Sequence, residues 1–200
     1  MGAVASWGQW DVFKADLLKS SRAVRSYLYH LENVYSREND YFHLRGQDNV
    51  LKFQAVGHVG IRIHEQDSLF ESLARLSAAW LTGCPVTLSV PANWGNATAD
   101  FLFSHHCKKL LQNVVVKREN EASFINSFQN FERIRYACAD RVSREVYQAA
   151  AKSGLTILRS AVLHNGRYEL PLYMLQQSLS NNYHRYGNLG ERAEMYNPKR

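Results

Sequence analysis

The sequence lacks the features that mark several classes of protein. Its only cysteines, Cys84, Cys107 and Cys138, are odd in number and show no paired spacing. This argues against a disulfide framework and favours a reducing, cytoplasmic setting. No apolar run approaches the roughly 20 residues of a membrane-spanning helix. We expect no signal peptide, because the start has no basic segment followed by an apolar one.

The motifs of common enzymatic chemistry are also missing. There is no G-x-G-x-x-G fingerprint, P-loop or G-x-S-x-G elbow. His105 and His106 adjoin Cys107, but successive residues of a helix point about 100° apart, so the three cannot converge on a metal or form a nucleophile and base. We therefore predict no catalytic, cofactor-binding or metal-binding residue in this chain, and the residues alone leave open whether it is an enzyme.

Charge gives a weaker indication. The net charge is +6 and the isoelectric point about 9.3, which can indicate nucleic acid. The basic residues are spread along the chain, however, and their densest stretches also contain acids. The pattern argues against a nucleic-acid partner, although a basic nucleic-acid-binding module stays one alternative. With 46% hydrophobic residues, the chain can bury one sizeable core.

The pattern of residues 57–90 predicts a strand, a helix and a second strand. Residues 58–63 and 85–90 are rich in β-branched side chains, as strands are. Ser68 and Glu71 have the spacing of a capping box, and Gly83 stands where a helix ends in a left-handed residue. The helix 68–82 is expected to bury a stripe at helical spacing, formed by Leu69, Leu73, Leu76 and Trp80.

The rest of the chain alternates in the same way. We expect helices at 10–37, 98–111, 121–131, from Asp140 or Ser143 to Gly154, and at 171–176. We expect strands at 50–55, 114–116 (buried), 134–138 and 155–158, with the first forming a hairpin with 58–63 and an Asn-Gly turn at 165–166. This order predicts an α/β fold: a Rossmann-like, mainly parallel sheet with helices on both faces, a long N-terminal helix and an extended C-terminal tail.

Three domains are predicted: a helical arm (1–44), the Rossmann-like domain (45–177) and the tail (178–200). Within the second, the loop 91–96 follows a strand, and ligands gather at the carboxyl ends of parallel strands. This loop lacks the glycines that bind a pyrophosphate, so a connection with a packed Trp94 is the favoured interpretation.

The tail 178–189 alternates as an extended strand does, and few of its residues are aliphatic. Such a strand gains most by adding to another sheet edge. We expect it to contact a partner, or a second copy in a homodimer, through Asn181, Tyr183, His184, Arg185, Tyr186, Asn188 and Leu189.

Several stretches together resemble the C-terminal region of proline utilization A, a bifunctional enzyme of proline catabolism. They are Arg25-Ser26-Tyr27, Gly46-Gln47-Asp48-Asn49, Asp67-Ser68-Leu69-Phe70, Gly83-Cys84-Pro85-Val86-Thr87 and Tyr183-His184-Arg185-Tyr186-Gly187-Asn188-Leu189. The resemblance runs from about residue 20 to the end, and the tail is its most specific part, while residues 95–150 match only in general pattern.

That family joins an FAD-dependent proline dehydrogenase to an NAD-dependent L-glutamate γ-semialdehyde (Δ1-pyrroline-5-carboxylate) dehydrogenase, an oxidoreductase of the aldehyde dehydrogenase superfamily. No position here matches their catalytic or cofactor motifs. The resemblance implies a non-catalytic domain that covers the cavity used for substrate channelling and contacts the upstream dehydrogenase domains. It also implies that FAD and NAD are bound elsewhere in the parent enzyme. An NAD-binding fragment of an aldehyde dehydrogenase is the other alternative.

Overall fold

The computed structural model describes residues 7–183 of the chain and contains two sheets. The strands are β1 (Asn39–Asp40), β2 (Gln47–Ala55), β3 (Val59–Arg62), β4 (Val86–Val90), β5 (Val114–Arg118), β6 (Arg133–Arg135), β7 (Thr156–Leu158) and β8 (Met174–Asn182). The α-helices are α1 (Trp7–His30), α2 (Leu69–Thr82), α3 (Ala97–Leu102), α4 (Lys108–Leu111), α5 (Glu121–Asn126), α6 (Arg144–Ser153) and α7 (Gly166–Glu169). None of the helices within 7–183 is long and apolar enough to cross a membrane.

The larger sheet has five parallel strands in the order β5-β4-β3-β6-β7. Its centre is formed by apolar strands buried on both faces, as parallel sheets require. Along the chain, β4 and β5 are added on one side of β3, and β6 and β7 are then added on its other side. The strand order therefore reverses between β3 and β6.

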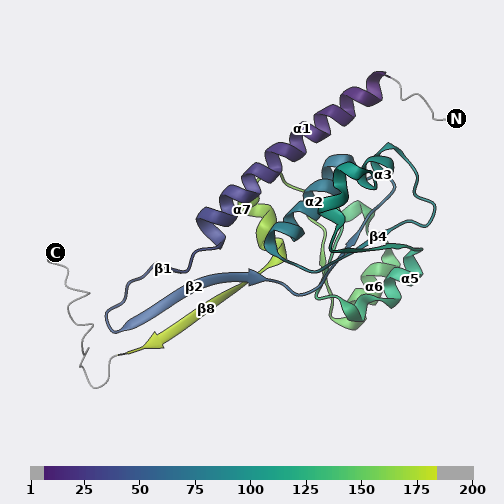
Figure 1. Ribbon diagram of the computed structural model, residues 1–200. Helices are drawn as coiled ribbons and strands as arrows, with labels where there is room; N and C mark the ends of the chain where they lie inside the picture. Colours follow the sequence, from purple (N-terminus) through teal and green to yellow (C-terminus); the bar gives the residue numbers. More distant parts are fainter. Residues whose placement is uncertain (1–6, 184–200) are drawn as a thin grey trace.

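Helices cover both faces of this sheet, which confirms the predicted α/β class. Figure 1 shows α1, α2 and α3 on one side and α5 and α6 on the other. The core is divided accordingly. One cluster includes Ile61, Leu76 and Leu88, whereas the other centres on Phe124 and Val146.

The second sheet is antiparallel, in the order β1-β2-β8. The prediction of a hairpin between residues 50–55 and 58–63 is therefore wrong. Both edges of β3 are already paired, with β4 and β6, so β2 has no free edge there. Instead β2 pairs along its whole length with β8, from Gln47↔Asn182 to Ala55↔Met174. The two strands form a ribbon that projects away from the helices (Figure 1).

Helix α2 confirms most of its predicted features. Ser68 and Glu71 form the capping box, and Gly83 ends the helix with φ of 79°. Leu69, Leu73 and Leu76 are buried, as predicted. The prediction that Trp80 is buried is wrong, because 53% of its surface is exposed. The last turn instead buries its small residues, Ala78 and Ala79, and leaves the indole outside.

The long N-terminal helix is also confirmed. It continues from α1 into a π-helical turn, η1 (Leu31–Tyr35). Ala23, Tyr27 and Tyr35 form its buried face, whereas Leu28 is 39% exposed. The two tyrosine hydroxyls donate to main-chain carbonyls of Leu163 and Arg167. These bonds tie α1 to the segment around α7.

Other boundaries differ from the prediction. The helix 98–111 is interrupted after Leu102 by a 3-10 turn, η2 (His105–Cys107), and 121–131 ends in a second one, η3 (Phe128–Asn130). The strand predicted to be buried at 114–116 is the edge strand β5, so Val115 and Val116 are exposed.

The C-terminal part departs most from the prediction. Asn165 caps α7 rather than forming a hairpin turn, and its side-chain oxygen accepts from the N–H of Arg167. Gly166 is required because a Cβ there would lie 2.7 Å from the carbonyl oxygen of Ser26. The predicted helix 171–176 is a 3-10 turn, η5 (Leu170–Tyr173), followed by β8. The division into three domains stays a prediction, although β8 continues across residues 177 and 178.

Replacing Leu76 by alanine tests the role of α2. Only 1% of Leu76 is exposed, so Leu76→Ala should lower the free energy of unfolding by ~2–5 kcal/mol, the usual range for a buried leucine. Trp80→Ala in the same helix is the control and should change it by ~0.5 kcal/mol, as at most surface sites. Urea denaturation followed by circular dichroism measures both, and equal losses would contradict the assignment of the buried face.

Candidate functional site

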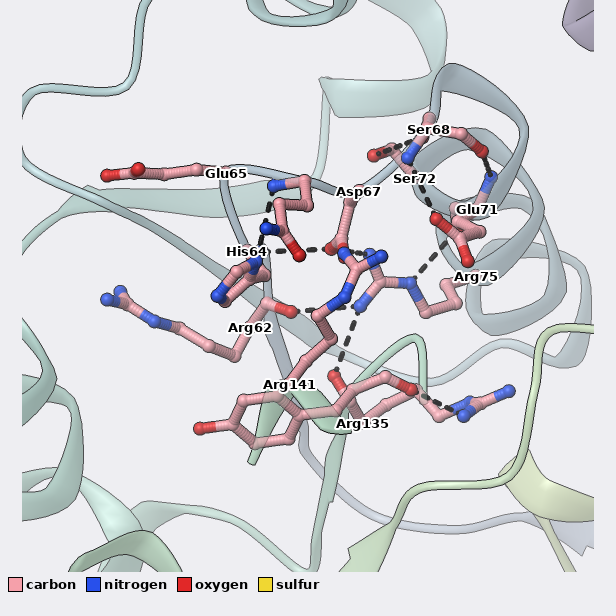
Figure 2. Close-up of polar contacts among 12 residues, drawn as sticks. Arg62, His64, Glu65, Asp67, Ser68, Glu71, Ser72, Arg75, Arg135 and Arg141 are labelled. Carbon is pink, nitrogen blue, oxygen red and sulfur yellow. Dashed lines mark hydrogen bonds and ion pairs between the residues drawn. The ribbon is translucent and has the colours of Figure 1, made fainter. Parts of the chain in front are cut away.

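The reversal of strand order between β3 and β6 marks the place to look for a site. In open α/β sheets ligands bind outside the carboxyl ends of the strands, at such a switch point. Here β3 ends at Arg62 and β6 at Arg135. Figure 2 shows that charged side chains converge on these strand ends.

The guanidinium of Arg75 fills the space between the two strand ends. Its Nη1 donates to the carbonyl oxygen of Arg62 at 2.9 Å and lies 3.5 Å from that of Arg135. Its Nε donates to the carbonyl oxygen of Glu71, in its own helix, at 2.9 Å. The side chain is fully buried. The crevice that would receive a ligand is therefore occupied by the protein itself (Figure 2).

Asp67 neutralises this buried cation and joins it to a second arginine. One carboxylate oxygen accepts from Nη2 of Arg75 at 2.5 Å and from the N–H of His64 at 2.9 Å. The other accepts from Nη1 of Arg141 at 2.7 Å. Arg141 belongs to the 3-10 turn η4 (Ala139–Arg141) after β6, so Asp67 fastens the loop after β3 to the loop after β6.

The amino terminus of α2 is likewise occupied. This end of a helix carries partial positive charge and free N–H groups, which suits it to phosphate. Here Glu71 accepts from the N–H of Ser68 at 2.8 Å, and Asp16 of α1 accepts from the N–H of Phe70 at 3.2 Å. Two carboxylates of the chain thus take the position in which an anionic ligand would be held.

A second buried ion pair lies beside the first. Nη2 of Arg135 is 2.9 Å from Oε1 of Glu169, and both side chains are fully buried. The other oxygen of Glu169 accepts from the N–H of Leu163 at 2.9 Å. Burial, and then the nearby Glu169, raise the pKa of Tyr173, so this hydroxyl stays protonated. The pair fixes α7 and η5 against the sheet and offers no free acid or base.

Neither ion pair was foreseen from the sequence. The helical periodicity did not assign Arg75 to the core, because at 3.6 residues per turn Arg75 lies about 120° around the helix from Leu69. A buried charge needs a partner. Asp67 lies one position before the cap of the helix, but no sequence rule selects it among the other carboxylates.

The loop 91–96 holds a packed tryptophan, as the sequence favoured. Trp94 is buried, its ring lies 6.2 Å from that of Phe103, and its carbonyl oxygen accepts from Arg118 at 3.2 Å. The loop is thus filled by its own side chain.

The cysteines are free, and two are deeply buried. Burial raises the pKa of the thiols of Cys84 and Cys107, which disfavours the reactive thiolate. His105 and His106 are exposed in the turn η2. Within residues 7–183, no three histidine, cysteine, aspartate or glutamate side chains are grouped so that they could hold a metal ion.

Only the first part of the predicted contact strand is described. Asn181 is exposed and pairs with Asp48 in the ribbon, and the N–H of Tyr183 donates to the carbonyl oxygen of Gly46 at 3.1 Å. Up to Asn182 the tail is thus paired within its own chain. Five of the predicted contact residues lie outside the described residues: His184, Arg185, Tyr186, Asn188 and Leu189. The proposed partner contacts of the whole set stay a prediction.

No family model matches the chain, and no curated protein matches it. Solved structures share its fold. A proline utilization A structure from Corynebacterium freiburgense is 18% identical over 93% of this chain and 16% of that chain, with a TM-score of 0.58. A proline utilization A mutant from Bradyrhizobium japonicum is 14% identical over 72% of this chain and 15% of that chain, with a TM-score of 0.58.

A third similar structure is an NAD-dependent benzaldehyde dehydrogenase from Corynebacterium glutamicum. It is 13% identical over 73% of this chain and 32% of that chain, with a TM-score of 0.56. At these identities the likeness shows the fold, and in fold the predicted resemblance to proline utilization A is confirmed. The chain spans about one sixth of the length of the proline utilization A chains that it matches.

Replacing Asp67 tests how tightly the crevice is held. Asp67→Asn removes the charge that neutralises Arg75 and should lower the free energy of unfolding by ~3–5 kcal/mol, because an uncompensated buried charge is left behind. Glu65→Gln, an exposed neighbour two positions earlier, should change it by less than ~0.5 kcal/mol. Chemical denaturation at constant pH compares the two, and an Asp67→Asn variant as stable as the parent would mean that the pair does not hold the loops together.

Proposed function

We propose that the chain is a non-catalytic, aldehyde-dehydrogenase-like domain of a bifunctional enzyme that converts proline to glutamate. Its role is to cover the cavity through which the intermediate passes and to aid assembly. The partners are then the dehydrogenase parts of the same enzyme, which bind FAD and NAD, and the location is cytoplasmic. The free cysteines suit that location.

The observation that carries this proposal is the filled ligand position of the sheet. The fold resembles that of NAD-dependent dehydrogenases, yet Arg75 occupies the switch point and Asp16 and Glu71 occupy the helix terminus above it. A dinucleotide would have to displace buried ion pairs to bind there. The domain has the fold of a dehydrogenase, but its own side chains fill the position of the ligand. This suits a domain that covers a cavity better than one that catalyses a reaction.

The ribbon of β2 and β8 supports the role in assembly. Leu175 and Leu179 lie on one face of β8, as alternate residues do, and are 40% and 49% exposed. Val50 stands opposite Leu179 and adds to the same face. A narrow ribbon is marginally stable alone, so an apolar face on a projecting one calls for a covering surface. The homodimer partner or the dehydrogenase part would supply it.

An NAD-binding fragment of an aldehyde dehydrogenase is the second candidate, favoured by the likeness to the benzaldehyde dehydrogenase. The two functions differ in one measurable property. A binding fragment is stabilised by NAD, because a ligand that binds only the folded state raises the unfolding temperature. A covering domain without a binding site is not stabilised by NAD.

The chain alone should therefore neither bind nor reduce NAD. We expect no shift of the unfolding temperature with millimolar NAD, and no NADH from L-glutamate γ-semialdehyde. The benzaldehyde dehydrogenase serves as positive control for the assay. NADH formation that is lost on replacing one of Cys84, Cys107 and Cys138 would overturn the proposal.

The ribbon face can be tested in the longer enzyme. Replacing both Leu175 and Leu179 by lysine should weaken assembly and let the intermediate escape, because the apolar face can no longer be covered. Coupled proline-to-glutamate turnover should then show a lag while each dehydrogenase keeps its own rate. The matched control replaces Gln176 and Ser178, on the opposite face of the same strand, by lysine. Unchanged assembly and coupling in the leucine variant would contradict the proposed role.

A further inference from the structure

A groove lies between α1, α2 and the interrupted helix after β4, away from the switch point. Figure 1 shows α1 running across α2 beside α3. The groove has a volume of about 510 Å³, within the range of small-molecule sites. It is lined by Leu17, Ser20, Ser21, Val24, Arg25, Leu73, Ser77, Phe101, His106, Cys107 and Leu110.

The break in the helix after β4 shapes this groove. Ser104 interrupts the helix: its hydroxyl donates to the carbonyl oxygen of Phe101 at 2.7 Å and accepts from the N–H of His106 at 3.3 Å. Phe101 therefore lines the groove from before the break, and Cys107 from after it. Phe13 of α1 closes against Phe101 with ring centroids 5.1 Å apart.

The walls are mostly apolar by area, and serine hydroxyls are set among the apolar side chains. Ser77 is only 7% exposed and lines the groove, yet among the described residues its hydroxyl makes no hydrogen bond. A hydroxyl in that position is a donor or acceptor available to a bound molecule. The thiol of Cys107, 5% exposed, lines the same wall.

The charge of the lining selects the sign of the ligand. It includes Arg25 and His106 and no acidic residue. The guanidinium of Arg25 is exposed and has no ion-pair partner within the part of the chain that the structure describes. A guanidinium beside an apolar groove suits a carboxylate, which it can bind through two parallel hydrogen bonds.

We infer that this groove binds an amphipathic monocarboxylate. The apolar body lies between Leu17, Leu73 and Leu110, the carboxylate faces Arg25, and Ser77 hydrogen-bonds to a polar atom of the ligand. The site is separate from the function proposed above, because none of its lining residues belongs to the ion-pair network or to the ribbon.

Decanoate is the probe for this site. Calorimetric titration of the 200-residue chain should give saturable binding, whereas decyltrimethylammonium, with the same alkyl chain and the opposite charge, should bind much less tightly. Arg25→Gln should weaken decanoate binding by about fivefold, the upper end of what an exposed ion pair contributes. Arg22→Gln is the matched control, since Arg22 is an exposed arginine three positions earlier on α1, outside the groove lining.

A second measurement locates the bound molecule. Decanoate should slow alkylation of Cys107, read by peptide mass spectrometry, and leave the rates at Cys84 and Cys138 unchanged. The assignment would be overturned if decanoate showed no saturable binding or if the cation bound equally well. It would also be overturned if Arg25→Gln and Arg22→Gln had equal effects, or if decanoate did not protect Cys107. A chain dimer that Arg25→Gln dissociates would overturn it too, because a second copy would then be the occupant.

Discussion

The buried pair of Arg75 and Asp67 is the interaction on which the arrangement of the parallel sheet's carboxyl end depends. Helix α2 supplies the cation, the loop after β3 supplies the anion, and Arg141 brings the loop after β6 to the same carboxylate. One carboxylate thus fixes α2 and the loop just before it to the loop after β6, which lies 74 residues further along the chain. Buried pairs contribute little net stability relative to apolar packing, but losing one partner is costly. Once present, the pair ties all three segments to a single arrangement.

That arrangement decides what the domain can do. An open α/β sheet gathers loops and a helix terminus at its switch point whatever its sequence, so the topology alone provides a place for a ligand. Function is set by the side chains placed there. In this chain Arg75 occupies the space between the strand ends, and Asp16 and Glu71 occupy the helix terminus. The proposed non-catalytic role follows from these side chains and not from the fold itself.

Much of the fold could be predicted from local patterns, and the failures have physical causes. The capping box at Ser68, the glycine stop at Gly83 and the strand–helix alternation are local, so the sequence contains them. Strand pairing is not local: β2 lies next to β3 in sequence but pairs with β8, because both edges of β3 are taken. The exposure of Val115 follows from the edge position of β5, which no periodicity within the strand reveals. The ion-pair network was missed for the same reason, since Asp67 and Arg141 meet only in the folded chain.

The two surfaces for which contacts are proposed both lie away from the filled switch point. Outside the larger sheet lie the apolar face of the ribbon, with Leu175 and Leu179, and the groove that Ser77 helps to line. The two differ in kind. The ribbon offers a long, shallow apolar face, which only another protein surface can cover. The groove is concave and carries one cation at its rim, which suits a small anion with an apolar body. On the proposed function, the domain would act through these two surfaces, and the sheet would hold them in place.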